Sequence, residues 1–149
     1  MAFVIPRRVA GALCAALCAV LTGCGKPDYE LAEVEGVVRV KGHTGAKIRV
    51  EFYPDPDKGV KGPTAVGETD DEGRFRLTVV NPKTQETQPG AVVGWHRVVL
   101  SDLRLAESET GRGVPVRFGS EYASVLSTPL TREVKAGGKQ TIEIDAPGK

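Results

Sequence analysis

Alternation of apolar and charged residues with a period of two is the feature of this sequence that most constrains its fold. In residues 33–41, Val34, Gly36, Val38 and Val40 take every second position, and charged residues fill most of the positions between them. Such alternation is typical of β-strands that bury one face. It recurs between Gly- and Pro-rich turn signals in seven segments, residues 33–41, 46–54, 64–69, 74–80, 92–102, 129–136 and 140–146. Seven short strands at this spacing predict an all-β chain that forms a seven-stranded antiparallel β-sandwich.

No segment after the first 23 residues shows a sustained apolar period of 3.6, so we expect little helix. The fifth and sixth predicted strands are separated by residues 103–128. Connections longer than about 12 to 15 residues are uncommon in compact domains and are often functional or mobile. The pattern assigns this long connection no conformation and no role.

The first 23 residues have the composition of a signal peptide. Arg7 and Arg8 precede an apolar run, residues 9–21, and the whole segment contains no acid. A helix needs about 20 apolar residues to cross a bilayer, so this run is too short to stay in the membrane as a span. We therefore expect residues 1–23 to be removed.

The run ends in Leu21, Thr22, Gly23 and Cys24, which resembles the lipobox of bacterial lipoproteins. This resemblance implies cleavage before Cys24 and lipidation of its thiol, and hence a membrane partner reached through Cys24. Because one acyl chain binds a membrane only marginally, stable anchoring needs two or more. The alternative is that Cys24 is one more small residue of a cleaved signal, like Cys14 and Cys18.

Lipidation at Cys24 would place the domain outside the cytoplasm, tethered by residues 24–32 and folded over residues 33–149. Gly25, in place of an Asp, favours the periplasmic side of the outer membrane over the inner membrane. The chain has three cysteines and all lie in its first 24 positions, so the mature domain is expected to fold without a disulfide.

The charge of the mature chain argues against one class of partner. Its 126 residues contain 18 basic and 19 acidic side chains. Nucleic-acid binding usually requires a clustered basic surface, so no nucleic-acid partner is expected.

The acidic stretch at residues 70–72 is expected to form a turn and not a metal site. An EF-hand needs acids at alternating positions and a Glu at the twelfth, and this spacing is missing. The sequence instead predicts a hairpin turn in which Gly73 takes a positive φ and the Asp70 side chain bonds the backbone.

The sequence offers no set of catalytic residues. His43 and His96 have no partner at zinc spacing, and no serine lies in a G-x-S-x-G elbow. We therefore expect no metal, no cofactor and no enzymatic activity.

Several motifs in order resemble one family. "TDDEGRF" at residues 69–75, the Pro-Gly before the fifth strand, "VPVRFGSEY" and "STPLTREV" are similar to the carboxypeptidase regulatory-like domains of small bacterial lipoproteins. The resemblance covers nearly all of residues 33–146 and implies a Greek-key, transthyretin-like (Ig-like) sandwich that acts as a non-catalytic accessory module. Arg132 departs from the pattern, because the family usually has an apolar residue between Leu130 and Val134.

Two functional hypotheses follow. The first is an interaction or structural module that binds an envelope protein through an exposed sheet edge or the long connection. The second is a module that binds a small ligand or glycan on an aromatic platform formed by Trp95, Tyr53 and Tyr122. The first is favoured because the mature chain contains few aromatic residues.

The orientation of Trp95 decides whether it is available to a partner. Trp95 shares one face of the fifth strand with Arg97, and His96 and Val98 share the other. Burial of an unpaired charge costs several kcal/mol, more than the roughly 1.5 to 3 kcal/mol gained by burying an apolar side chain. The sequence therefore predicts that His96 and Val98 point inward and that Trp95 faces solvent.

Overall fold

The computed structural model describes residues 28–107 and 113–148, so the predicted signal peptide and the lipobox residues Leu21, Thr22, Gly23 and Cys24 lie outside the described residues. The strands are β1 (Leu31–Val40), β2 (His43–Thr44), β3 (Ile48–Pro54), β4 (Ala65–Glu68), β5 (Arg74–Arg76), β6 (Thr78–Val80), β7 (Thr87–Pro89), β8 (Ala91–Val92), β9 (Gly94–Asp102), β10 (Thr131–Val134) and β11 (Lys139–Ala146). The short helices are the 3₁₀ turns η1 (Pro56–Lys58) and η2 (Ser120–Ala123) and the α-helix α1 (Leu103–Glu107).

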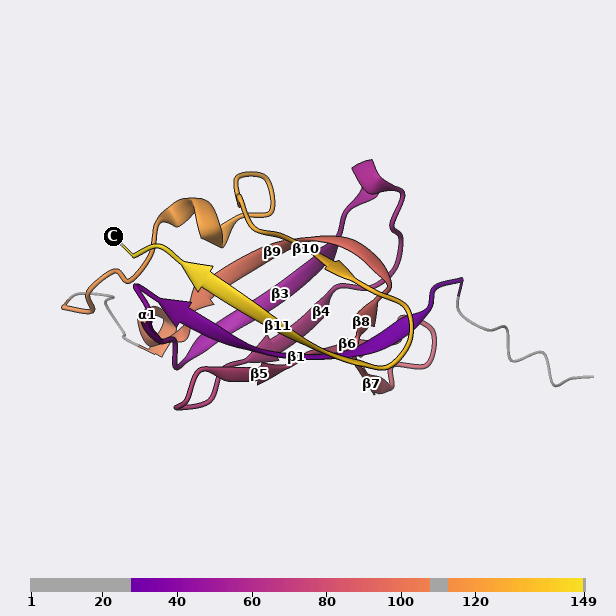
Figure 1. Cartoon of the computed structure of the whole chain (residues 1–149), viewed down its shortest axis with the longest axis horizontal. Coiled ribbons are helices and arrows are strands. Elements are labelled where there is room, and N and C mark those ends of the chain that lie inside the picture. The colour runs from indigo at the N-terminus through magenta and orange to yellow at the C-terminus, as the bar shows by residue number, and fades with distance from the viewer. Residues whose placement is uncertain (1–27, 108–112, 149) are drawn as a thin grey trace, which may run out of the picture.

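The strands form two sheets that face each other, so the chain is an all-β, sandwich-like domain (Figure 1). One sheet is centred on β1, which pairs with β11 along one side and with β8, β5 and β2 in turn along the other. The second sheet has the strand order β10-β9-β3-β4-β6-β7.

The core lies between the sheets and is built from the inward positions of the alternating segments. In β1 the buried positions are every second residue from Ala32 to Val40, which is the pattern that the sequence predicted. Side chains from β3, β9 and β11 and from Leu77, between β5 and β6, pack against them. The largest fully buried side chains are Phe52, Ile48, Leu77, Leu100 and Ile144. Alternation therefore identified the buried faces of β1, β3 and the segment 74–80 correctly. In β9, Val99 on the outward face is buried as well.

The prediction of seven strands, all antiparallel, was wrong. The described residues form eleven strands, and β1 and β11 run parallel. The last two strands are joined through Gly137 and Gly138, both with positive φ, but they do not form a hairpin. β10 belongs to the second sheet and β11 to the first. Because the chain crosses between sheets at this turn, β11 arrives beside β1 in the same direction.

The segment 74–80, predicted as one strand, is divided between the two sheets at Leu77. β5 pairs with β1, whereas β6 pairs with β4. Leu77 is buried at the crossing, and its N–H donates to the carbonyl of Val34. Continuous alternation describes both halves equally well, which is why the sequence did not reveal the change of sheet.

The folded domain also begins earlier than predicted. Leu31 and Ala32, assigned to the tether, are the first residues of β1 and pair with β8. Ala32 is buried. Leu31 and Ala32 therefore belong to the sandwich and not to the predicted tether.

The turn between β4 and β5 has the predicted conformation. Gly73 has a φ of 75°, and its carbonyl accepts a hydrogen bond from the N–H of Val38. Asp70 Oδ1 accepts from the N–H groups of Glu72 and Arg74, at 3.0 and 2.8 Å. The hydrogen bond from the Arg74 N–H is the leading cause that lowers the pKa of Asp70, and the Arg74 side chain adds to it.

We predict that Gly73→Val destabilises the domain. The left-handed conformation costs a β-branched residue roughly 1 to 3 kcal/mol, and a Cβ at this position would lie 2.8 Å from the carbonyl oxygen of Val38. Asp71→Asn, at the neighbouring exposed position, should leave the thermal midpoint nearly unchanged. Melting curves with and without calcium check both statements, and a midpoint that rises with calcium would contradict the assignment of this segment as a structural turn.

Candidate functional site

Trp95 lies on the outer face of the second sheet, as the sequence predicted. Its side chain is 41% exposed, whereas His96 and Val98 are 0% exposed on the inner face. Cross-strand pairing places Arg97 beside Tyr53 of β3 and Thr131 of β10, and Trp95 beside Glu133. We call the surface formed by Tyr53, Trp95, Arg97, Thr131 and Glu133 the Trp95 face.

Arg97 is held in place by two carboxylates from the loop that follows β3. Its Nη2 lies 2.5 Å from Asp57 Oδ2, and its Nε lies 3.5 Å from Asp55 Oδ1. The Asp55 backbone N–H donates to the carbonyl of Trp95, and its side chain accepts from the N–H of Asp57. The loop and the strand therefore fix each other, and Trp95 is presented on a rigid support.

Tyr53 and Tyr122 differ in their availability to a partner. Tyr53 is half-buried on the Trp95 face, where burial and then Glu51 raise the pKa of its hydroxyl. Tyr122 is 6% exposed and packs edge-on against Phe118, with ring centroids 6.3 Å apart. The prediction of Tyr122 as a contact residue was wrong, because η2 turns its ring into the core. The three aromatic residues do not form one platform.

His96 is a buried core residue. Its Nδ1 lies 2.9 Å from the carbonyl oxygen of Gly94, and its ring contacts that of Phe52. Burial lowers the pKa of His96, outweighing the hydrogen bond to Gly94 and the charge of Asp55. Among the described residues, no cluster of three or more His, Cys, Asp or Glu side chains could hold a metal ion.

The structure explains how a charged residue, Arg132, is accommodated where the motif that the sequence resembles usually has an apolar residue. Arg132 lies directly opposite His96 in the sheet, and so starts on the inner face. Its guanidinium reaches the edge of the sandwich, where Nη1 donates to the carbonyl of Thr131 and Nη2 to that of Glu143 in β11. An arginine is tolerated at this position because its charged head leaves the core and bonds both sheets.

β10 and β11 are the edge strands of the two sheets and lie on the same side of the sandwich. Side-chain and backbone contacts cover much of this open side. The side-chain amide of Gln140 bonds both the N–H and the carbonyl of Lys135. Farther along, Phe118 forms a β-bridge with Gly148. Together with Arg132, these contacts occupy backbone groups that an added strand would need, so this edge is a poor site for strand addition.

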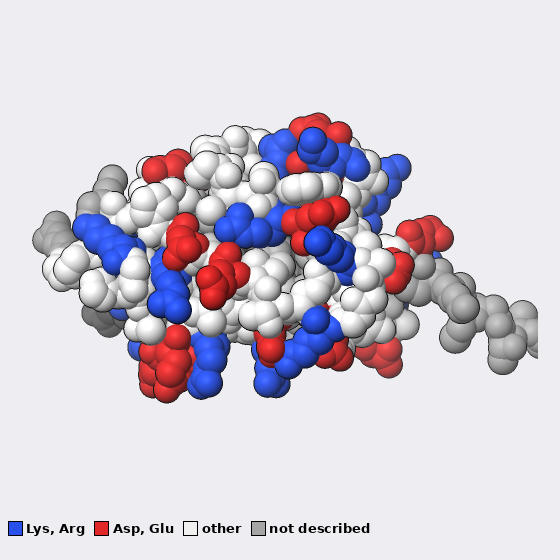
Figure 2. Space-filling view, viewed as in Figure 1, with Lys and Arg blue, Asp and Glu red and all other residues white. Residues whose placement is uncertain are grey.

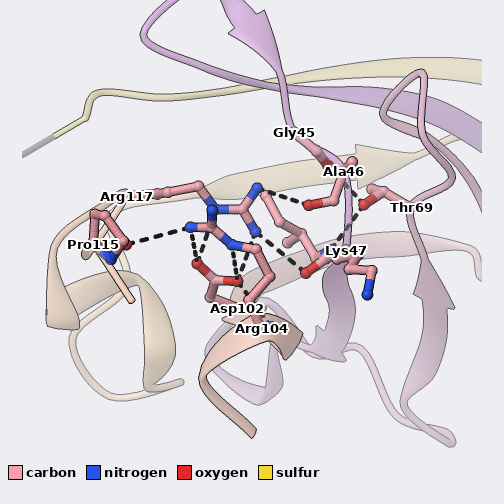
Figure 3. Close-up of polar contacts among 9 residues, drawn as sticks. Gly45, Ala46, Lys47, Thr69, Asp102, Arg104, Pro115 and Arg117 are labelled. Atoms are coloured by element: carbon pink, nitrogen blue, oxygen red, sulfur yellow. Dashed lines mark hydrogen bonds and ion pairs between the residues drawn. The ribbon is translucent and has the colours of Figure 1, made fainter. Parts of the chain in front are cut away.

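A buried ion-pair network, missed by the sequence analysis, fastens the long connection to the second sheet (Figure 3). Asp102, at the end of β9, has a side chain that is only 3% exposed and lies between the guanidinium groups of Arg104 and Arg117. Arg117 also donates to the carbonyls of Ala46 and Lys47, about seventy positions away in sequence. Arg104 in turn donates to the carbonyl of Pro115. We call this network the Asp102 clamp.

The two arginines set the ionisation of Asp102. Burial would raise the pKa of this carboxyl, but hydrogen bonds from Arg104 and Arg117 outweigh it and hold the pKa at about 2. The carboxyl group of Asp102 is therefore ionised at neutral pH. Both guanidinium groups bond Asp102 and backbone carbonyls, which makes the clamp a structural feature.

A groove of about 710 Å³ crosses the outer side of the first sheet. Its charges neutralise each other, since Glu35 pairs with Lys139 at 2.7 Å and with Arg76 at 3.7 Å, and Asp70 pairs with Arg74. On the face shown in Figure 2, basic and acidic side chains are interspersed. The residues lining the groove are Glu35, Gly36, Val37, Glu68, Asp70, Arg74, Phe75, Arg76, Lys139 and Thr141. They include no nucleophile paired with a base.

Comparisons with protein-family models, with curated proteins and with solved structures gave no match to this chain. Within the part of the chain that the structure describes, no helix has the length and apolar character needed to cross a membrane. The Trp95 face is the candidate functional site, because it combines an exposed aromatic residue with fixed charged groups.

We predict that Asp102→Asn lowers the stability of the domain by about 2 kcal/mol at neutral pH, as judged from the difference between a pKa of about 2 and the usual 3.8. Because the folded pKa is the lower one, this stabilisation is present above pH 4 and is lost as the pH falls toward 2. Denaturant titrations from pH 7 to pH 2 should show a shallower loss of stability for Asp102→Asn than for the unmodified chain. Asp71→Asn is the matched control, and equal slopes for Asp102→Asn and the unmodified chain would contradict the role of the clamp.

Proposed function

We propose that this chain is a non-catalytic, lipid-anchored module of the cell envelope that binds a protein partner. In this proposal Cys24 carries the lipid, and the domain lies outside the cytoplasm on the periplasmic side of the outer membrane. The domain is of the carboxypeptidase regulatory-like type with a Greek-key, transthyretin-like topology. The lipobox and the ordered motifs of the sequence support this proposal, and the all-β architecture with two facing sheets is consistent with it.

The observation that carries the choice of contact surface is the exposure of Trp95 on a rigid strand. Tryptophan is enriched among the residues that contribute most to protein interfaces, and Arg97 next to it is enriched there as well. Arg97 already has its partners in Asp55 and Asp57, so it adds no ordering cost when a partner binds. A sheet face that presents an exposed aromatic residue beside a fixed arginine suits a protein surface.

The sheet edge is the less favoured route to a partner. Arg132, Gln140 and Phe118 already form hydrogen bonds or a β-bridge with the backbone along the side of the sandwich where β10 and β11 lie. On the other side of β1, the strands β8, β5 and β2 fill the pairing positions in succession. Contact through side chains of the Trp95 face is therefore favoured over strand addition.

The alternative function, binding of a glycan or small ligand, has one specific observation in its favour. Trp95 offers an exposed ring on the same sheet face as Arg97, which the Asp57 carboxylate holds, and sugars stack on such rings and bond such carboxylates. Because Tyr122 is buried and Tyr53 is half-buried, Trp95 is the one exposed ring of the predicted platform. A single exposed ring favours a protein partner over a glycan.

We predict that a photo-crosslinking amino acid at position 95 captures an envelope protein in living cells. The same amino acid at Val80, which is 50% exposed, is the matched control and should give a different or no adduct. With the captured partner purified, Trp95→Ala should weaken binding by about 30-fold, the effect of losing an interface residue worth about 2 kcal/mol. Identical adducts at both positions, or saturable binding to a glycan array that Trp95→Ala abolishes, would refute the protein-binding proposal.

We predict that Cys24→Ala leaves a precursor of full length that no longer incorporates labelled fatty acid, because the thiol that accepts the lipid is gone. Cys18→Ala is the control and should be labelled normally. Metabolic labelling followed by gel electrophoresis makes the comparison, and equal labelling of both variants would eliminate lipid anchoring at Cys24.

A further inference from the structure

The chain is fastened to the domain closer to Cys24 than the sequence indicated. Tyr29 packs in the space above Gly62, where an added Cβ would lie 3.3 Å from the Tyr29 ring and 2.7 Å from Val92. The carbonyl of Glu30 accepts a hydrogen bond of 2.9 Å from the N–H of Val93. Pairing of β1 with β8 begins at the next residue, Leu31. The position of the chain relative to the sandwich is thus fixed from Tyr29 onward.

Only residues 25–28 separate this attachment from the predicted lipidated cysteine. Four residues span at most about 14 Å when fully extended. A domain anchored through Cys24 therefore cannot move far from the surface of its membrane, and the end of the sandwich that carries Tyr29 must lie nearest to it.

Three loops lie at the same end of the sandwich as Tyr29, namely residues 55–64, 81–86 and 135–138. Strand register places them there, since Pro54 pairs with His96, Val80 with Thr87, and Gly94 with Val134. Figure 1 shows the described chain entering β1 at this end, beside these loops. We call Tyr29 and these three loops the tether end.

We propose that the tether end rests on the phospholipid headgroups of the membrane, so that the sandwich stands on this end. The proposal rests on the lipid anchoring proposed above. The Asp102 clamp lies at the opposite end, next to the segment between β1 and β3, and therefore points away from the bilayer.

The side chains of the tether end suit the headgroup layer. Lys58, Lys61, Lys83 and Lys135 are exposed in its loops, and lysines reach headgroup phosphates on flexible stems. Asp28, Glu30 and Glu86 are exposed at the same end. Because these acids largely balance the lysines, the short tether and not a net charge holds the end against the membrane, and anionic lipid is not required.

The Trp95 face begins at this end. Trp95 is two residues from Val93, whose N–H donates a hydrogen bond to the carbonyl of Glu30. The carbonyl of Trp95 accepts a hydrogen bond from the N–H of Asp55 in the loop 55–64. A protein that binds the Trp95 face must consequently come close to the layer of lipid headgroups. The orientation thus narrows the proposed partner to one that is itself embedded in or attached to the same membrane.

Quenching of tryptophan fluorescence by nitroxide-labelled lipid tests this orientation directly, because Trp95 is the only tryptophan of the chain. The purified lipidated full-length mature protein is reconstituted into phosphatidylcholine vesicles that carry a nitroxide quencher on the headgroup. The control variant combines Trp95→Phe with His43→Trp. His43 is exposed in β2, opposite Val40 at the far end of β1. β1 has ten residues and a length of about 30 Å at 3.3 Å per residue. Trp95→Phe with Val116→Trp gives a second probe at the far end, where Val116 is exposed.

We expect the headgroup nitroxide to quench Trp95 at least twofold more strongly than either far-end probe. Equal quenching of all three positions, or stronger quenching at position 43 or 116, would overturn the orientation. Flotation of the vesicles is measured first, since a protein that carries no lipid and does not float refutes the anchoring itself. The two failures are thereby distinguished.

Discussion

The pairing of β1 on both of its sides is the interaction on which the rest of the structure depends. β11 lies along one side, and β8, β5 and β2 share the other, so one ten-residue strand pairs with four other strands. Its inward side chains contribute to the core at every second position. Because the second sheet closes over these same side chains, a change in the register of β1 would move its apolar face into solvent and expose the core of the whole domain.

Closure of the strand edges determines which surfaces remain for a partner. Free edges invite uncontrolled pairing, and proteins commonly block them with charged side chains. Here Arg132 bonds carbonyls of both sheets, and Gln140 bonds the backbone of Lys135 as a strand would. The Trp95 face therefore remains as the more accessible surface, and its rigidity derives from the pairing of Arg97 with Asp55 and Asp57.

The two ends of the sandwich are stabilised by different means. At the far end, Asp102 and its two arginines hold the long connection against the segment between β1 and β3. At the tether end, Tyr29 and Glu30 fasten the incoming chain to β8 and its neighbouring loop. An anchored domain of this design would keep a nearly constant height above its membrane, because neither end requires a long flexible segment.

The sequence by itself determined the strand class, the buried faces of β1 and β3, the turn at Asp70 and Gly73, and the outward orientation of Trp95. Each of these depends on neighbours within a few positions, through the pleat of a strand or the cost of burying Arg97. Only the tertiary structure decided that β11 runs parallel to β1, that Leu77 divides one predicted strand between two sheets, and that Tyr122 is buried. It also brought Arg117 to the carbonyls of Ala46 and Lys47. Those outcomes depend on which distant segments meet, and alternation with a period of two is the same whichever strand lies alongside.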